Sequence, residues 1–200
     1  MENSKKINSQ IKRLQKFEKE IAKLYEKAKI RFPIHLSGGN EKQLIKIFKK
    51  FDITKRDFIF STWRSHYHWL LSNRSAKKLK QQILKHGSMH IYDKNFFTSS
   101  IVNGITPIAL GVALAYKLKN SKKRVFCFVG DMASKGGLFS ECVRYAKGHD
   151  LPILYIIEDN ELSVKTPTKE VWGRKNVKKT IKYKYKRQYP HSGCGVFVLF

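Results

Sequence analysis

Two residues with oxygen-donor side chains follow two apolar runs near the centre of the chain. Asp131 comes after 125–129 and Gly130, and Asn160 follows the run 151–157. Each run is too short for a helix, and a segment of helical spacing lies between them, which predicts a strand–helix–strand unit of a parallel sheet. Such strands end at one edge, where open α/β sheets bind ligands. Carboxylate and amide oxygens suit Mg²⁺ or Ca²⁺ rather than Zn²⁺.

The stretch from Ala133 to Gly137 is the second part of this pattern. It is small, contains glycine and precedes the helical segment. Its backbone N–H groups, at a helix N-terminus, could meet phosphate groups, and Mg²⁺ in proteins usually takes ligand phosphates as well. An ordinary strand–helix–strand unit with a polar loop is the alternative for this stretch taken alone.

Three further residue types could do chemistry elsewhere in the chain. Trp63 and Arg64 follow a short predicted strand, and a guanidinium there could hold two phosphate oxygens. His66 could assist proton transfer near neutral pH. His35 precedes a Gly-Gly turn and is either catalytic or part of a loop. For each, the alternative is an ordinary surface or packing residue.

The elements that must position these residues follow from apolar spacing. We expect an α/β fold, a parallel sheet with helices on both faces. Its other elements are helices over 4–30, 41–51, 75–85 and 104–118 and a strand over 57–62. We divide the chain into an amphipathic helix, a ligand-binding domain and a basic segment that ends in an apolar strand, at 1–30, 31–168 and 169–200.

Charge is the strongest feature of the composition. The 200 residues carry 41 Lys and Arg against 15 Asp and Glu, a net charge of +26. The lysines are spread along the chain, which favours an acidic partner or an anionic ligand over nucleic acid. No apolar run reaches membrane-spanning length and the N-terminus lacks an apolar signal region. Three cysteines without metal-ligand spacing favour a reduced, cytoplasmic setting, with Cys127 and Cys142 in the core.

Five segments, taken in order, resemble one known family. They are IHLSGGNE (34–41), WRSH (63–66), HGSMH (86–90), SSIVNGITPIALGVALA (99–115) and the stretch from Gly130 to Thr166 with its Gly-Asp and Asn. The chain resembles the α-subunit of thiamine-diphosphate-dependent E1 enzymes, the 2-oxo acid and acetoin dehydrogenase family. The resemblance implies the thiamine-diphosphate-binding fold, with thiamine diphosphate and Mg²⁺ as cofactors.

The resemblance also implies roles for the matching residues. The metal ligands would be the side chains of Asp131 and Asn160 and the backbone carbonyl of Leu162. Histidines near the reacting carbon of the cofactor would be His35 and His66. The cofactor-binding residues would be Trp63, Arg64, Val102, Gly130, Asp131, Met132, Ala133 and Asn160.

The function implied is that of an enzyme subunit that acts on a 2-oxo acid, by decarboxylation and acyl transfer. A β-like subunit would complete the site in an α2β2 heterotetramer, with a lipoyl acyltransferase as a further partner and no membrane or nucleic acid. The alternatives are a split transketolase-like subunit that transfers a two-carbon ketol unit, and a degenerate or basic nucleic-acid-binding protein.

Three departures from the family pattern bear on this reading. Met132 stands where the family has glycine, and Asp159 stands where it has the first Asn of a pair. The family's later helices and a His-containing loop have no counterpart in 169–200. The first two departures fall within the predicted cation site itself.

Overall fold

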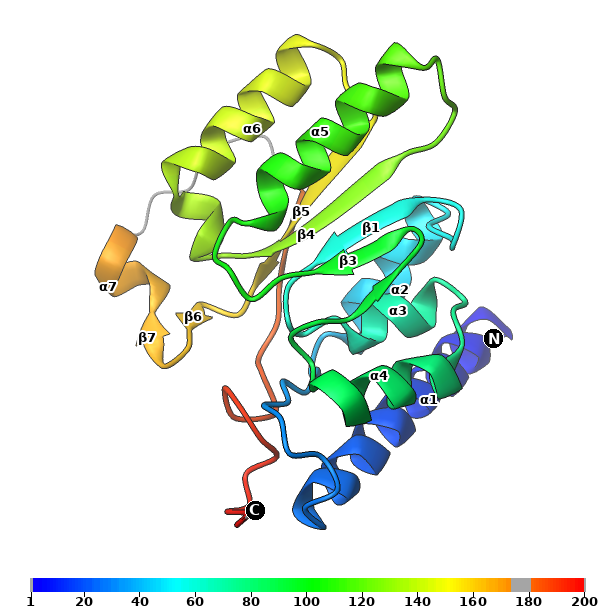
Figure 1. Cartoon of the computed structure of the whole chain (residues 1–200), viewed down its shortest axis with the longest axis vertical. Coiled ribbons are helices and arrows are strands. Elements are labelled where there is room, and N and C mark those ends of the chain that lie inside the picture. The colour runs from blue at the N-terminus through cyan, green and yellow to red at the C-terminus, as the bar shows by residue number, and fades with distance from the viewer. Residues whose placement is uncertain (1, 174–180, 200) are drawn as a thin grey trace. The chain divides into compact units, whose positions relative to one another are not determined.

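A computed structural model describes residues 2–173 and 181–199 in two compact units (Figure 1). The first unit comprises the described residues of Met1–Lys55, Trp63–Ile91 and Lys186–Phe200, and the second comprises Arg56–Thr62 and Tyr92–Tyr185. Each unit is made of more than one stretch of the chain, and the second unit, for example, combines Arg56–Thr62 with Tyr92–Tyr185. The predicted boundaries near 30 and 168 do not coincide with this division.

The second unit is built on a six-stranded sheet in the order β2-β3-β1-β4-β5-β8. All neighbouring strands are parallel except the pair β2 and β3. The predicted α/β class with a parallel sheet is therefore confirmed. The strands are β1 (Phe58–Ser61), β2 (Tyr92–Asp93), β3 (Phe96–Thr98), β4 (Val125–Gly130), β5 (Ile153–Asp159) and β8 (Ile181–Lys184), and a separate ribbon is formed by β6 (Leu162–Ser163) and β7 (Thr166–Pro167).

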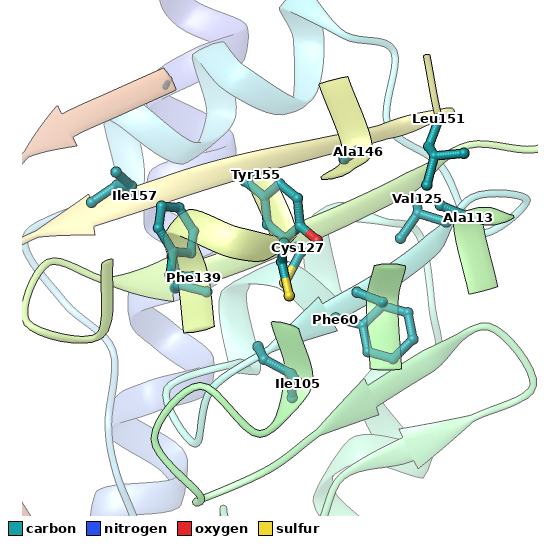
Figure 2. Close-up of a cluster of buried hydrophobic side chains, with 13 residues drawn as sticks. Phe60, Ile105, Ala113, Val125, Cys127, Phe139, Ala146, Leu151, Tyr155 and Ile157 are labelled. Atoms are coloured by element: carbon teal, nitrogen blue, oxygen red, sulfur yellow. The ribbon is translucent and has the colours of Figure 1, made fainter. Parts of the chain in front are cut away.

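Two helices cover one face of this sheet (Figure 1). Alternate residues of β4, namely Val125, Cys127 and Val129, point to that face, because successive side chains of a strand point to opposite sides. The helices of this unit are α5 (Ile105–Leu118), α6 (Gly137–Gly148), the short α7 (Thr168–Trp172) and a 3₁₀ turn, η1 (Ala133–Lys135). Figure 2 shows the resulting core, in which small residues of α5 and α6 allow close packing.

The first unit is helical in its described residues. Its helices are α1 (Glu2–Glu26), α2 (Glu41–Lys50), α3 (His66–Leu71) and α4 (Ala76–His86). The apolar stripe predicted for the first helix is buried at Leu14, Phe17 and Ile21. Ser75 caps α4 by accepting a hydrogen bond from the N–H of Lys78, 3.2 Å away. The sequence did not indicate α3, whose six residues are too few for a clear period.

The C-terminal segment differs from the prediction. The described residues 194–199 form no helix or strand, and Val196, Phe197 and Leu199 are exposed. A strand lies earlier, in the basic stretch of β8, where lysines suit an edge strand. Residues 174–180 of the predicted basic segment lie outside the described residues.

Within the described part of the chain, no helix is long and apolar enough to span a membrane.

The core of the second unit makes a direct prediction for stability. Phe139 is buried and packs edge-to-face against Tyr155, with ring centroids 5.5 Å apart (Figure 2). Phe139→Ala should lower the free energy of unfolding by about 3–5 kcal/mol, because it removes apolar contacts and leaves a cavity. Leu138→Ala, at the exposed neighbouring position, should change it by less than about 1 kcal/mol. Urea denaturation measures both, and equal effects would contradict the assignment of the core.

Candidate functional site

Asp131 lies at the carboxyl end of β4 and is buried. The Thr168 hydroxyl donates a hydrogen bond to its Oδ2, and the Ser134 hydroxyl donates to its backbone carbonyl at 2.7 Å. Burial raises the pKa of the Asp131 carboxyl, the Thr168 hydrogen bond opposes that shift, and the nearby Asp159 carboxylate adds to it. Asp131 is thus a buried acid whose ionised form gains from a nearby positive charge.

Asn160 begins a polar turn at the carboxyl end of β5. Its Oδ1 accepts a hydrogen bond from the N–H of Leu162 at 3.0 Å, and its Nδ2 donates to the Tyr185 hydroxyl at 3.2 Å. Asp159 Oδ1 likewise accepts from the N–H of Glu161, also at 3.0 Å. Asn and Asp side chains favour such turns, because they bond to the backbone two residues further on. Two consecutive bonds of this kind order the turn.

A cavity of about 620 Å³ joins these groups in the second unit. The three predicted metal ligands, Asp131, Asn160 and Leu162, all line it. Thr168 lines it as well, together with the lysines Lys135, Lys169, Lys182 and Lys184. Oxygen donors beside several ammonium groups fit a hard cation together with a phosphate-bearing ligand. The described residues hold no cluster of three or more His, Cys, Asp or Glu suited to a metal.

The turn after β4 accommodates the methionine that replaces glycine. Met132 has φ −62° and ψ −47°, in the right-handed helical region that any residue can adopt. Ala133 follows as the first residue of η1, and Gly136 precedes α6 without a side chain to cap its first N–H groups. A Cβ on Gly130 would meet no atom within 4 Å. The backbone is therefore open at Gly130 and unstrained at Met132.

Val102 is exposed, and Asn103, which follows it, was not among the predicted site residues. The Asn103 amide donates a hydrogen bond to the carbonyl of Ala133 at 2.8 Å, and Asn103 Oδ1 accepts one from the Thr106 hydroxyl at 3.2 Å. These bonds tie the start of α5 to the turn after β4. A signal was present, because the pair Asn103-Gly104 directly before α5 is a typical turn sequence.

The first unit gathers the other predicted residues around a histidine near the C-terminus. The His191 ring lies 5.1 Å from the His35 ring and 6.1 Å from the Trp63 ring, between centroids. Arg64 donates a hydrogen bond through Nη2 to the carbonyl of His191 at 3.0 Å. His191 was not predicted, because its sequence surroundings show no pattern that relates it to residues 35–64.

His35 is held in its neutral form in this cluster. Burial lowers its pKa from the ordinary 6.5 to about 3, and the charges of Arg64, His191 and His66 act in the same direction. Its backbone N–H donates to the Ser88 hydroxyl at 3.1 Å. Among the described residues, its Nδ1 has no hydrogen-bond partner. The ring is therefore a neutral acceptor or donor at physiological pH, not a cation.

His66 is fully buried and both of its ring nitrogens are engaged. Nδ1 lies 3.0 Å from Glu18 Oε1, and Nε2 lies 2.9 Å from the Ser88 hydroxyl. Glu18 Oε1 also accepts the N–H of Ser37 at 3.1 Å. Glu18 was missed as a site residue, although a carboxylate on the apolar stripe of a helix is itself a signal of a buried polar partner.

The fold and the cavity define the class of this protein. An α/β sheet with a lysine-lined polar cavity at the carboxyl ends of its parallel strands belongs to the class of open α/β proteins that bind ligands at this edge of the sheet. A family model described as "Dehydrogenase E1 component" matches residues 9–182. The chain belongs to this dehydrogenase E1 family, and the resemblance found in its sequence is confirmed.

Relatives with curated descriptions agree with this assignment. The chain is 32% identical over 163 residues to a probable mitochondrial pyruvate dehydrogenase E1 component subunit alpha of Caenorhabditis elegans, a match that covers 76% of the chain and 41% of that protein. It is also 32% identical over 167 residues to the corresponding subunit of Rickettsia prowazekii, covering 76% of the chain and 50% of that protein. The chain thus spans half or less of the length of these relatives.

The buried pair of Glu18 and His66 predicts a large stability effect. Glu18→Ala removes the acceptor of both the His66 ring and the N–H of Ser37, and should cost about 3 kcal/mol of unfolding free energy. Glu20→Ala removes only the exposed ion pair with Lys80 and should cost less than about 1 kcal/mol. Chemical denaturation compares the two. A loss no larger for Glu18→Ala than for Glu20→Ala would refute the buried network.

The lowered pKa of His35 predicts a pH dependence of stability. Between pH 6.5 and about 3, the unfolded chain takes up a proton that folded His35 does not, so stability falls as the pH falls through this window. From pH 7 to about pH 4.5, wild type should lose about 1–2 kcal/mol more than His35→Gln, allowing for solvent screening. His90→Gln, at an exposed position, is the control and should follow wild type. Parallel pH profiles for wild type and His35→Gln would rule this out.

Proposed function

We propose that this chain acts as an α-subunit of a thiamine-diphosphate-dependent enzyme and binds the Mg²⁺–diphosphate half of the cofactor. The substrate class would be a 2-oxo acid, with decarboxylation and acyl transfer as the reaction. Family membership supports the cofactor, and the relatives' description as pyruvate dehydrogenase subunits supports the substrate class. The observation that carries the proposal is the cavity where Asp131, Asn160 and Leu162 meet four lysines.

The cation would be held by oxygen atoms of two neighbouring strand ends. Asp131 and Asn160 would contribute side-chain oxygens, and Leu162 its backbone carbonyl. A divalent cation beside Asp131 would favour the ionised carboxylate and so offset the burial that raises its pKa. Asn160 Oδ1 accepts one hydrogen bond, from the N–H of Leu162, and a carbonyl oxygen has a second lone pair to offer.

The diphosphate would meet the turn after β4. The backbone N–H of Ala133 and the N-terminus of α6 would face it, with Gly130 and Met132 shaping the turn. Trp63 and Arg64 are proposed as further contacts to the diphosphate, and Val102 as the backbone contact to the aminopyrimidine. When bound, thiamine diphosphate supplies the carbanion chemistry, while the protein positions it and excludes water.

The two histidines proposed for proton transfer differ in what they can do. His35 is neutral, and its Nδ1 has no partner among the described residues, so this nitrogen is available for a hydrogen bond to a ligand. His66 already bonds Glu18 and Ser88 through its two ring nitrogens. We therefore propose His35 as the more direct participant, with His66 acting through the position of Ser88 and the backbone of His35.

The partner would be a β-like subunit that completes the active site, in an α2β2 heterotetramer. The naming of the relatives as alpha subunits supports a second kind of subunit. A lipoyl acyltransferase is the proposed acceptor of the acyl group, and the proposed location is the cytoplasm. The net charge of +26 would suit an acidic partner surface.

Cofactor binding tests the proposed function. The chain co-expressed with its β-like subunit should bind thiamine diphosphate in a Mg²⁺-dependent manner, measured by titration calorimetry. Asp131→Asn and Asn160→Ala should each weaken binding at least about tenfold, because the first removes the negative charge of a metal ligand and the second removes a ligand oxygen. Asp150→Asn, at an exposed position in the second unit, is the matched control and should bind like wild type. Wild-type binding that neither ligand substitution weakens would overturn the proposal.

A further inference from the structure

Asp159 is a buried carboxylate directly before the proposed ligand Asn160. Its side chain is only 4% exposed, and Oδ2 lies 2.6 Å from Nζ of Lys182. Its Oδ1 accepts the N–H of Glu161, so both oxygens are engaged. A carboxylate this deeply buried is stable in its ionised form only with such partners. Lys182 supplies the positive charge among them.

Lys182 reaches Asp159 because of the register between β5 and β8. Ile157 pairs with Lys182 and Asp159 with Lys184 in this parallel ladder. Lys184 instead pairs with Glu161 at 2.5 Å, and these two side chains are 68% and 69% exposed. Lys182 is 27% exposed. The same cavity therefore contains one protected ion pair and one solvent-screened ion pair.

The ion pair of Lys182 and Asp159 decides how many carboxylates without a compensating positive charge face the cavity. Asp131 and Asp159 both line it, at the ends of neighbouring strands, and the charge of Asp159 acts on Asp131. With Asp159 uncompensated, the cavity would attract a cation more strongly and repel a diphosphate. An asparagine at this position would need no such compensation, since an amide carries no charge.

We propose that Lys182 is a positioning residue whose positive charge neutralises Asp159. Asp131 can then bind a cation, and a diphosphate can bind beside it without repulsion from a second uncompensated carboxylate. This inference rests on the proposed function of the cavity and assigns a new role within it. Lys182 acts through Asp159 and does not itself need to contact the diphosphate. Its position on β8 makes the last strand of the sheet part of the binding site.

Two simple probes of opposite charge test the inference on the 200-residue chain. Calorimetry measures Mg²⁺ alone, and inorganic diphosphate with the metal removed by chelation. Lys182→Met leaves Asp159 bare, and should bind Mg²⁺ roughly tenfold more tightly and diphosphate roughly tenfold more weakly than wild type. Asp159→Asn should shift both affinities in the opposite directions. The double variant, which again has a neutral pair, should return to within about threefold of wild type for both probes.

Two further variants separate charge from structure. Lys182→Arg keeps the positive charge and should bind both probes like wild type. Lys184→Met removes the exposed lysine of the neighbouring pair, and solvent screening should limit its effect to about threefold or less. A structural defect would weaken both probes together, whereas the inference requires opposite shifts from a single substitution.

The outcomes that would overturn the inference are distinct. Unchanged affinities in Lys182→Met would show that the pair does not set the charge of the cavity. A double variant that binds diphosphate as weakly as Lys182→Met would show that Lys182 contacts the anion directly. Failure of the proposed function would look different, because the chain with its β-like subunit would then bind no thiamine diphosphate. The relative affinities of the variants for Mg²⁺ and for diphosphate would still decide the role of Lys182.

Discussion

The parallel register of β4 and β5 is the constraint on which the candidate site depends. Gly130 pairs with Glu158, so the next residues of both strands, Asp131 and Asp159, emerge at the same edge of the sheet. The register is held by packing, because a slip of one residue would turn the buried face of β4 away from α5 and α6. Burial of an apolar face thus places the polar groups.

Acidic groups at this edge need partners, and the chain after β5 supplies them. Thr168 of α7 donates to Asp131, Lys182 of β8 pairs with Asp159, and Tyr183 of β8 donates to Glu158. All three carboxylates are buried, and a buried carboxylate without such a partner would be strongly unfavourable. The late segments therefore belong to the site, although the sequence presents them as a basic tail.

Local patterns predicted the strand–helix–strand unit, and long-range pairing explains what they missed. The apolar runs before Asp131 and Asn160 are recognisable because each is bounded by turn residues. β8, with the sequence IKYK, has little apolar character, and only the open edge of β5 makes it a strand. The terminal apolar stretch was wrongly expected to be the strand, because hydrophobicity was weighed above the availability of a pairing edge. Glu18 and His191 were missed because their hydrogen-bond partners are remote in sequence.

The methionine within the cavity's turn shows how backbone geometry decides which departures from a family pattern matter. Glycine is required where φ is positive or where a side chain would collide with its surroundings. Neither condition holds at Met132. Its φ of −62° lies in the ordinary helical region, and its side chain is only half-buried. The substitution is therefore compatible with the observed path of the backbone through the turn. Asp159 is the more consequential departure, because it introduces a charge that the turn cannot absorb and that Lys182 must balance.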